Sequence, residues 1–198
     1  MHVTDAIILK KEAAGEADLL ITALTPDFVR VRLVAQGARK VGAKLKGHLE
    51  PLSLSRLSFV AGRNNYRLVG AELQNFFPTV KGEPWRFRIA SDIAKILDSV
   101  LFEDVAEGGG NFFALAREAL MFLDEPSRTL EDCNKAFLWF RMQFLKESGL
   151  LPEGIAGLGG LDGANFASCG DFADFLDKAR GAELVGAVSR LFMTYLPR

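Results

Sequence analysis

The hydrophobic pattern of this 198-residue chain changes its period near residue 78. Before that point apolar and polar residues alternate, as in VRVRLVA at 29–35, where Arg30 and Arg32 lie on the face opposite Val29, Val31 and Leu33. Beyond it, apolar residues recur at helical spacing, as in the series from Ile89 to Leu101. The change predicts a part built of strands followed by a part built of helices.

The first part contains about five segments with the pattern of strands, separated by turn residues. They are DAIILKK, LLITALT, VRVRLVA, LSLSRLSF and the segment after the GRNN turn. In LSLSRLSF the apolar phase flips near Arg56, as an extra, bulged residue would make it do. Because bulges coil a short sheet, we expect a five-stranded β-barrel of the OB type.

The second part has the pattern of a helical bundle. Helices are predicted over 89–101 and 112–123, and Thr129 with Asp132 resembles a capping box that opens a third helix. This third helix is apolar on nearly every side between residues 136 and 145, which is typical of the central helix of a bundle. Two further helical segments follow near the end of the sequence.

The expected fold class is therefore α+β, with an N-terminal barrel followed by an all-α domain. We expect the domain boundary at residue 80, which gives an OB-fold domain over 1–80 and a helical domain over 81–198. A glycine-rich loop at 149–170 interrupts the helical domain.

Charge is distributed unevenly along the chain. Between Phe28 and Gly70 nine cations face a single acid, Glu50, so this segment has a net charge of +8. Residues 81–198 hold 13 cations and 18 acids, although the whole chain has a net charge of only −1. Such a division indicates a polyanion-binding part attached to something else.

The cations are most concentrated in AQGARKVGAKLKGHLEP, residues 35–51, which contains Arg39, Lys40, Lys44 and Lys46. The stretch fails the nucleotide-binding pattern G-x-x-x-x-G-K-[ST], because Ala43 follows Gly42 where a lysine is required. A nucleic-acid backbone is favoured as the ligand, and a merely solvated loop is the alternative. Tyr66 follows a turn and is a candidate for base stacking, whereas Phe59 alternates in phase with the barrel core.

The sequence has few residues suited to catalysis or metal binding. It lacks G-x-S-x-G and H-E-x-x-H patterns, and its only histidines are His2 and His48. Cys133 and Cys169 are isolated, so we expect buried thiols rather than a zinc site. No catalytic residue, cofactor or metal is therefore expected. No apolar run reaches the roughly 18–20 residues of a membrane span, and the start lacks a secretory signal, so we expect a cytoplasmic protein.

Residues 15–73 resemble the N-terminal domain of the recombination mediator RecO. GEADLL, LTP, the A-x-GARK run, LEP and the closing AEL occur in the order and spacing of that family, and FRMQFLKESGLLPE in the helical part matches it more loosely. The resemblance implies a nucleoid-associated DNA repair and recombination protein, without catalysis, that binds single- and double-stranded DNA and anneals complementary strands. It further implies that RecR is a partner in loading RecA onto strands coated by the single-stranded-DNA-binding protein.

The resemblance also suggests site residues. The family's DNA-binding cations fall on Arg39, Lys40 and Lys44, with Lys46 adjacent. We add the strand cations Arg30 and Arg32, and Tyr66, as candidate DNA-binding residues.

A second site is expected for the acidic, Phe-ended tail of the single-stranded-DNA-binding protein. Arg141 of the third helix is the candidate for the tail's carboxylates, with Lys146 nearby and Phe137 and Phe144 lining a groove. The alternative is that Arg141 is paired within its own fold.

The sequence departs from the RecO pattern in two places. Many relatives carry a four-cysteine zinc site after the GLLPE turn, whereas here the glycine-rich loop replaces it and only Cys169 remains. The turn before the third strand usually has a glycine, and PDFV in its place suggests a rebuilt hairpin. Two alternatives stay open: an OB-fold RNA-binding adaptor without a recombination role, and an enzyme acting on nucleic acid, which is disfavoured by the missing catalytic motifs.

Overall fold

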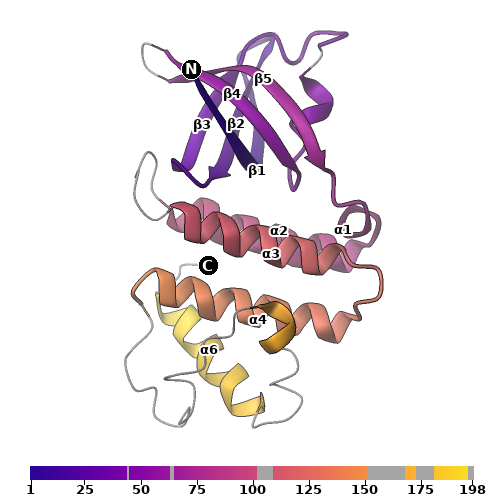
Figure 1. The fold of residues 1–198 in the computed structure, drawn as a ribbon, viewed down its shortest axis with the longest axis vertical. Helices are drawn as coiled ribbons and strands as arrows, with labels where there is room; N and C mark the ends of the chain where they lie inside the picture. The colour runs from indigo at the N-terminus through magenta and orange to yellow at the C-terminus, as the bar shows by residue number, and fades with distance from the viewer. Residues whose placement is uncertain (44, 63–64, 102–108, 151–167, 173–180, 196–198) are drawn as a thin grey trace.

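In a computed structural model the chain forms a barrel stacked on layers of helices (Figure 1). The structure describes residues 1–43, 45–62, 65–101, 109–150, 168–172 and 181–195. The barrel strands are β1 (His2–Ala14), β2 (Asp18–Thr25), β3 (Val29–Ala35), β4 (Leu54–Ala61) and β5 (Tyr66–Asn75). A short 3-10 helix, η1 (Lys46–His48), lies in the long connection between β3 and β4.

The five strands close into a barrel in the order β1-β2-β3-β5-β4. Neighbouring strands are antiparallel except β3 and β5, which run parallel and pair at Leu33 with Tyr66 and at Val34 with Arg67. β1 is long enough to pair with β2 along its second half and with β4 along its first half. Helices follow the barrel, so the predicted α+β class with an N-terminal five-stranded OB-type barrel is confirmed.

The bulges that coil this barrel are not at Arg56, where the sequence pattern placed one. The pairing of β4 with β5 skips Val69 and Gln74, so both extra residues belong to β5, and the pairing of β1 with β2 skips Leu9. The phase in β4 flips because Ser55 is buried and its hydroxyl donates a 2.7 Å hydrogen bond to the carbonyl of His48. A polar residue therefore occupies a covered position without any insertion in its own strand.

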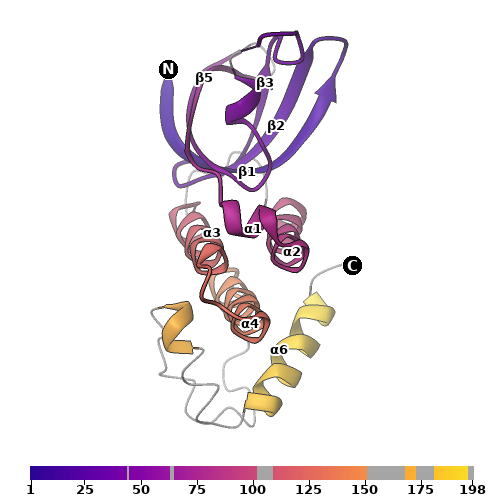
Figure 2. The same ribbon diagram turned by 90° about the vertical axis from the view of Figure 1, so that its right-hand side faces the viewer.

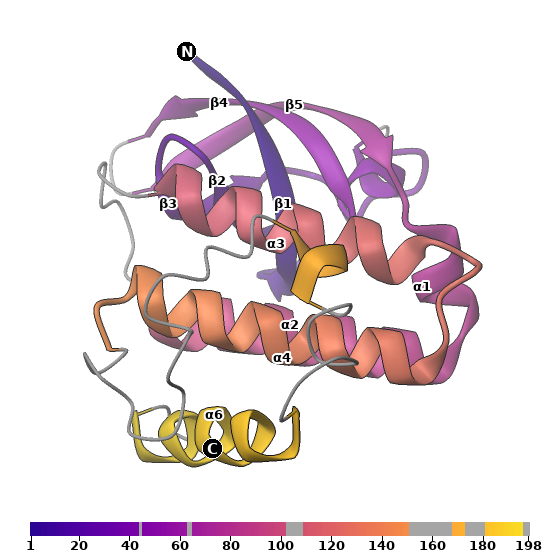
Figure 3. The ribbon, with the colours of Figure 1, turned by 60° about the horizontal axis from the view of Figure 1, so that its bottom comes forward.

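The helices form three successive layers beneath the barrel (Figures 1 and 2). They are α1 (Pro78–Gly82), α2 (Pro84–Val100), α3 (Gly109–Asp124), α4 (Leu130–Glu147) and α6 (Gly181–Tyr195). α2 and α3 lie next to the barrel, α4 packs against both, and Figure 3 shows α4 between α3 and α6. Among the described helices, none combines the length and the apolar character that crossing a bilayer requires.

The capping box predicted at the start of α4 is confirmed. The Thr129 hydroxyl accepts from the backbone N–H of Asp132 at 3.2 Å, and the Asp132 carboxylate accepts from the backbone N–H of Thr129 at 2.9 Å. These hydrogen bonds lower the pKa of Asp132, because they favour its charged form. Along α4, Trp139, Phe140 and Phe144 are buried, as expected for the central helix of a bundle.

One apolar cluster joins the barrel to the helices. Ile7, Leu24 and Leu52 of the barrel part pack in the same buried cluster as Ile93 of α2 and Leu120 of α3. A second cluster, around Ile21, fills the barrel interior. The strands end at Asn75 and helix begins at Pro78, but the buried core continues across this junction. The division into domains at residue 80 stays a proposal.

The hairpin between β2 and β3 is built without glycine. Val29 has φ = 53° and is only 4% exposed. A β-branched residue rarely adopts a left-handed backbone, so this turn is strained. The Thr25 hydroxyl holds it by accepting a 3.0 Å hydrogen bond from the backbone N–H of Phe28.

Arg86 of α2 is a fully buried cation whose hydrogen bonds hold α2 against the end of α3 and against the connection between α3 and α4. Its guanidinium donates to the carbonyls of Leu123 at 2.6 Å, of Glu125 at 2.9 Å and of Arg128 at 2.6 Å. It also forms a 2.8 Å ion pair with Glu83. The C-terminal carbonyls of α3 thus receive the donors that a helix end lacks.

Candidate nucleic-acid interface

The basic segment begins in a loop at 36–43 that is fixed to the β1–β2 turn. The backbone N–H of Arg39 donates to the Ala17 carbonyl at 2.9 Å, and the Arg39 side chain donates to the Gly15 carbonyl at 2.9 Å. The backbone N–H of Gly37 donates to the Asp18 carboxylate at 2.7 Å. Gly37 has φ = 66°, a conformation that glycine adopts at little cost. The chain here is therefore an ordered turn.

The far end of the same connection is fixed to β5. Nδ1 of His48 accepts a 3.1 Å hydrogen bond from the backbone N–H of Leu73. The next residue, Leu49, is fully buried and packs in the interior cluster of the barrel. The basic connection is thus anchored at both ends, which holds its cations near one part of the barrel surface.

Arg39 and Lys40 are exposed on this loop. The Lys40 side chain makes no hydrogen bond or ion pair with any residue that the structure describes, and it lies beside Gly37. Lys44 lies outside the described residues, and the side chain of Lys46 does as well. For these four residues a DNA-binding role stays a prediction.

The two strand cations differ in their surroundings. Nε of Arg30 lies 2.9 Å from the Asp98 carboxylate of α2, and the Arg30 side chain is only 19% exposed. Arg30 also donates to the Leu101 carbonyl at 3.4 Å, so it joins β3 to the end of α2. Arg32, two residues on, is exposed on the outer face of β3.

Part of the barrel face formed by β2 and β3 is covered. α3 packs against both strands, and Thr22, the partner of Arg32, is only 2% exposed. In OB folds this face and the adjoining loops are the usual binding surface for oligonucleotides. The covered face leaves the anchored basic loop and the uncovered part of β3 and β5 as the accessible cationic surface.

Tyr66 lies in a cluster of four aromatic rings with His2, Phe28 and Phe59. The ring centroids of Tyr66 and Phe59 are 5.3 Å apart, and those of His2 and Phe28 are 4.9 Å apart. Phe59 is fully buried, which confirms its assignment to the core, whereas Tyr66 is half-buried.

The residues proposed for tail binding lie on α4 and differ in burial. Phe144 is fully buried, so in this structure its side chain belongs to the core. The Arg141 guanidinium lies 4.0 Å from the ring centroid of Phe192 in α6, and burial lowers the pKa of Arg141. Phe137 is half-buried and Lys146 is exposed. The tail-binding role of these residues stays a prediction.

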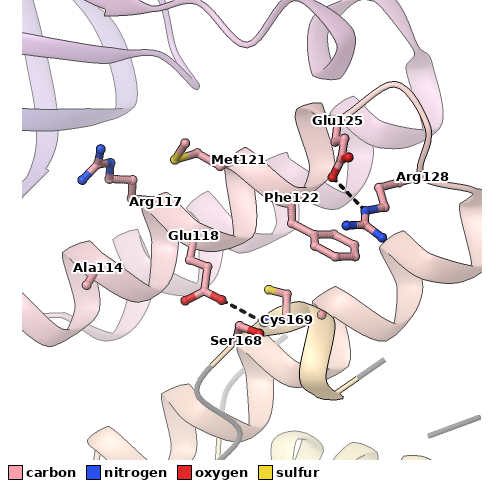
Figure 4. Close-up of a pocket in the computed structure, with 10 residues that line it drawn as sticks. Ala114, Arg117, Glu118, Met121, Phe122, Glu125, Arg128, Ser168 and Cys169 are labelled. Atoms are coloured by element: carbon pink, nitrogen blue, oxygen red, sulfur yellow. Dashed lines mark hydrogen bonds and ion pairs between the residues drawn. The ribbon is translucent and has the colours of Figure 1, made fainter. Parts of the chain in front are cut away.

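A cavity of about 710 Å³ lies elsewhere, between α3 and the helical turn at 168–172 (Figure 4). Phe122, Met121 and Arg117 of α3 contribute to its lining. The backbone N–H of Cys169 donates to the Glu118 carboxylate at 2.8 Å, which fixes the turn against α3. None of the four residues named on α4 lines this cavity.

The two cysteines are buried, free thiols, as expected. Burial raises the pKa of Cys133 to about 11, and it raises the pKa of Cys169 as well. Within the described ranges no group of three histidine, cysteine or acidic side chains is placed to hold a metal ion.

Comparison with known proteins gives a consistent set of relatives. A family model described as "Recombination protein O N terminal" matches residues 1–77. A protein named DNA repair protein RecO from Roseiflexus sp. is 36% identical over 104 residues, which cover 52% of this chain and 36% of the relative. The protein of that name from Dehalococcoides mccartyi is 31% identical over 150 residues, or 76% of this chain and 57% of the relative.

The match extends into the helices. The RecO protein of Heliobacterium modesticaldum is 28% identical over 153 residues, or 77% of this chain and 53% of the relative. The chain therefore spans about half the length of curated relatives that it matches. The similarity includes the barrel, the anchored basic loop and the helices next to them.

Proposed function

This chain belongs to the RecO family, and from that membership we propose that it is a mediator of DNA repair and recombination. In this proposal the protein binds single- and double-stranded DNA, anneals complementary strands and, together with RecR, promotes the loading of RecA onto strands coated by single-stranded-DNA-binding protein. It acts by binding rather than by catalysis, in the cytoplasm at the nucleoid.

The observation that carries the proposal is the anchored basic loop. Arg39 and Lys40 project from a turn whose backbone is hydrogen-bonded to the β1–β2 turn, and the His48 ring at the end of η1 accepts a hydrogen bond from the backbone of β5. Cations on a fixed backbone lose less conformational entropy when phosphates bind them. Neutralised phosphates release counterions, so binding of this kind depends strongly on salt.

The proposal is tested by fluorescence anisotropy of the whole chain with labelled oligonucleotides of matched sequence. We expect single-stranded DNA to bind with a salt slope of roughly −3 to −4, which corresponds to four to six neutralised phosphates. Addition of the complementary strand should then accelerate duplex formation over the rate without protein. Binding of RNA at least as tight as DNA, with no annealing, would favour an RNA-binding adaptor instead.

For the partner tail, we propose the cavity beside α3 as a second candidate docking place besides the predicted residues on α4. An acidic tail that ends in phenylalanine needs an apolar recess with a cation at its edge. Phe122 and the 51%-exposed Met121 supply the apolar surface. Arg117 also lines the cavity, and its guanidinium makes no hydrogen bond or ion pair with the described part of the chain.

Replacing Arg117 by alanine is expected to weaken binding of a labelled acidic peptide ending in phenylalanine by about tenfold, the cost of one charged hydrogen bond. Arg88→Ala removes the same charge from an exposed position on α2 and serves as the control. If Arg117→Ala binds normally while Arg141→Ala abolishes binding in a folded protein, the tail docks on α4 instead.

A further inference from the structure

We propose that the aromatic rings at one rim of the barrel form a stacking site for an unpaired base, with Arg67 contacting the adjoining phosphate. This aromatic rim consists of His2, Phe28, Phe59 and Tyr66. The inference rests on the proposed DNA binding and assigns it a second contact, one that distinguishes single strands from duplex.

The strand topology brings the four rings together. His2 is the first residue of β1, Phe28 directly precedes β3, Phe59 lies near the end of β4, and Tyr66 is the first residue of β5. His2 lies over Phe59 with 5.3 Å between centroids and an interplanar angle of 32°. Tyr66 meets the other three rings edge to face, at 5.3 to 6.1 Å.

These rings differ from an ordinary core cluster in their exposure. Phe59 forms a fully buried floor, but Phe28 and Tyr66 are half-buried and His2 is exposed. The Tyr66 hydroxyl makes no hydrogen bond with the residues that the structure describes. An accessible aromatic surface on a rigid floor suits a base, because stacking needs only a flat apolar partner.

Arg67 connects the aromatic rim to the basic loop. It follows Tyr66 directly and pairs with Val34, two residues before the loop begins at 36. Its side chain is exposed and has no hydrogen bond or ion pair within the described ranges. A strand held by Arg39 and Lys40 can therefore pass Arg67 and reach Tyr66.

The acid nearest the rim in sequence is Asp27, which is exposed. The Asp27 carboxylate accepts a 2.5 Å hydrogen bond from the Thr4 hydroxyl. By contrast, exposed Arg56 on β4 lies 3.8 Å from Asp5 and pairs across the sheet with Glu72. Arg67, unlike Arg56, is therefore not ion-paired with any residue that the structure describes, and it lies directly after Tyr66 of the rim.

The experiment compares two labelled oligonucleotides of equal length by anisotropy. One is oligo-dT, and the other carries abasic residues, so both present the same number of phosphates. We expect the wild-type chain to prefer oligo-dT by roughly 5- to 150-fold, the range for stacking one base. Tyr66→Ala should lose most of this preference, Tyr66→Phe should keep it, and Phe87→Ala, at another exposed ring, should keep it too.

The phosphate contact proposed for Arg67 is tested by a separate measurement, the salt dependence of binding. Arg67→Ala should lower the affinity for both oligonucleotides equally. It should also reduce the magnitude of the salt slope by about 0.7, the value for one phosphate on a single strand. Arg56→Ala is the matched control and should leave the slope unchanged.

The outcomes separate this inference from the proposed function. Equal wild-type affinity for the two oligonucleotides overturns the stacking site but leaves DNA binding intact. Failure to bind either one overturns both. If Tyr66→Ala does not fold by circular dichroism, His2→Ala replaces it, since that ring is exposed, and an unchanged preference in His2→Ala also counts against the site.

Discussion

Removing the four cations of the basic connection together is expected to abolish most of the salt-dependent DNA binding. In the variant with alanine at Arg39, Lys40, Lys44 and Lys46, the salt slope for single strands should fall in magnitude by about three, because each phosphate contact contributes roughly 0.7. A fourfold rise in salt would then cost the wild type roughly 50-fold more affinity than the variant. Anisotropy over a salt series measures both quantities.

The control for this experiment is a variant of equal charge. Alanine at Lys10, Arg56, Arg88 and Lys95 removes four exposed cations elsewhere, three of which are ion-paired, with Glu12, Asp5 and Asp92. Its slope should stay near that of the wild type. Equal slopes for wild type and the loop variant, with both folded, would mean that the loop does not contact phosphates.

Replacing Arg86 by methionine is expected to reduce the free energy of unfolding by about 3–5 kcal/mol, as for removal of one member of a buried charged network. Methionine fills much of the volume, but the carbonyls of Leu123, Glu125 and Arg128 lose their donor. Buried acceptors without partners account for the large cost. Since small proteins have a total stability of about 5–15 kcal/mol, the loss should be visible as a much lower urea midpoint.

Arg88→Met provides the comparison for Arg86, because Arg88 is exposed on the same helix two residues away. A surface substitution of this kind should change the stability by at most about 0.5 kcal/mol. If the two variants unfold at the same urea concentration, the carbonyl network around Arg86 does not hold the helices together.

Local features of this fold were readable from the sequence. Alternation predicted β3, the Thr129 and Asp132 pair predicted the start of α4, and the run of apolar residues predicted its central position. These features depend on residues within a turn or a strand of one another, so periodicity and capping chemistry describe them well.

The contacts that decide the site are between distant residues, and the sequence did not reveal them. Arg30 and Asp98 are 68 positions apart, and nothing in either segment indicates that they pair. The covering of β2 and β3 by α3 likewise depends on how two parts pack. Arg67 was counted among the cations, but its place beside Val34 follows only from the parallel pairing of β3 and β5.

The apolar cluster shared by barrel and helices has a consequence for building chimeras between relatives. A barrel transplanted without α2 and α3 would expose Ile7, Leu24 and Leu52 to water. Each side chain would then lose the roughly 1.5–3 kcal/mol of hydrophobic stabilisation that its burial provides. Exchange of the nucleic-acid-binding part between relatives therefore requires that α2 and α3 are exchanged together with the barrel. The unit that can be exchanged therefore extends at least through α3, which ends at Asp124, rather than stopping at the last strand.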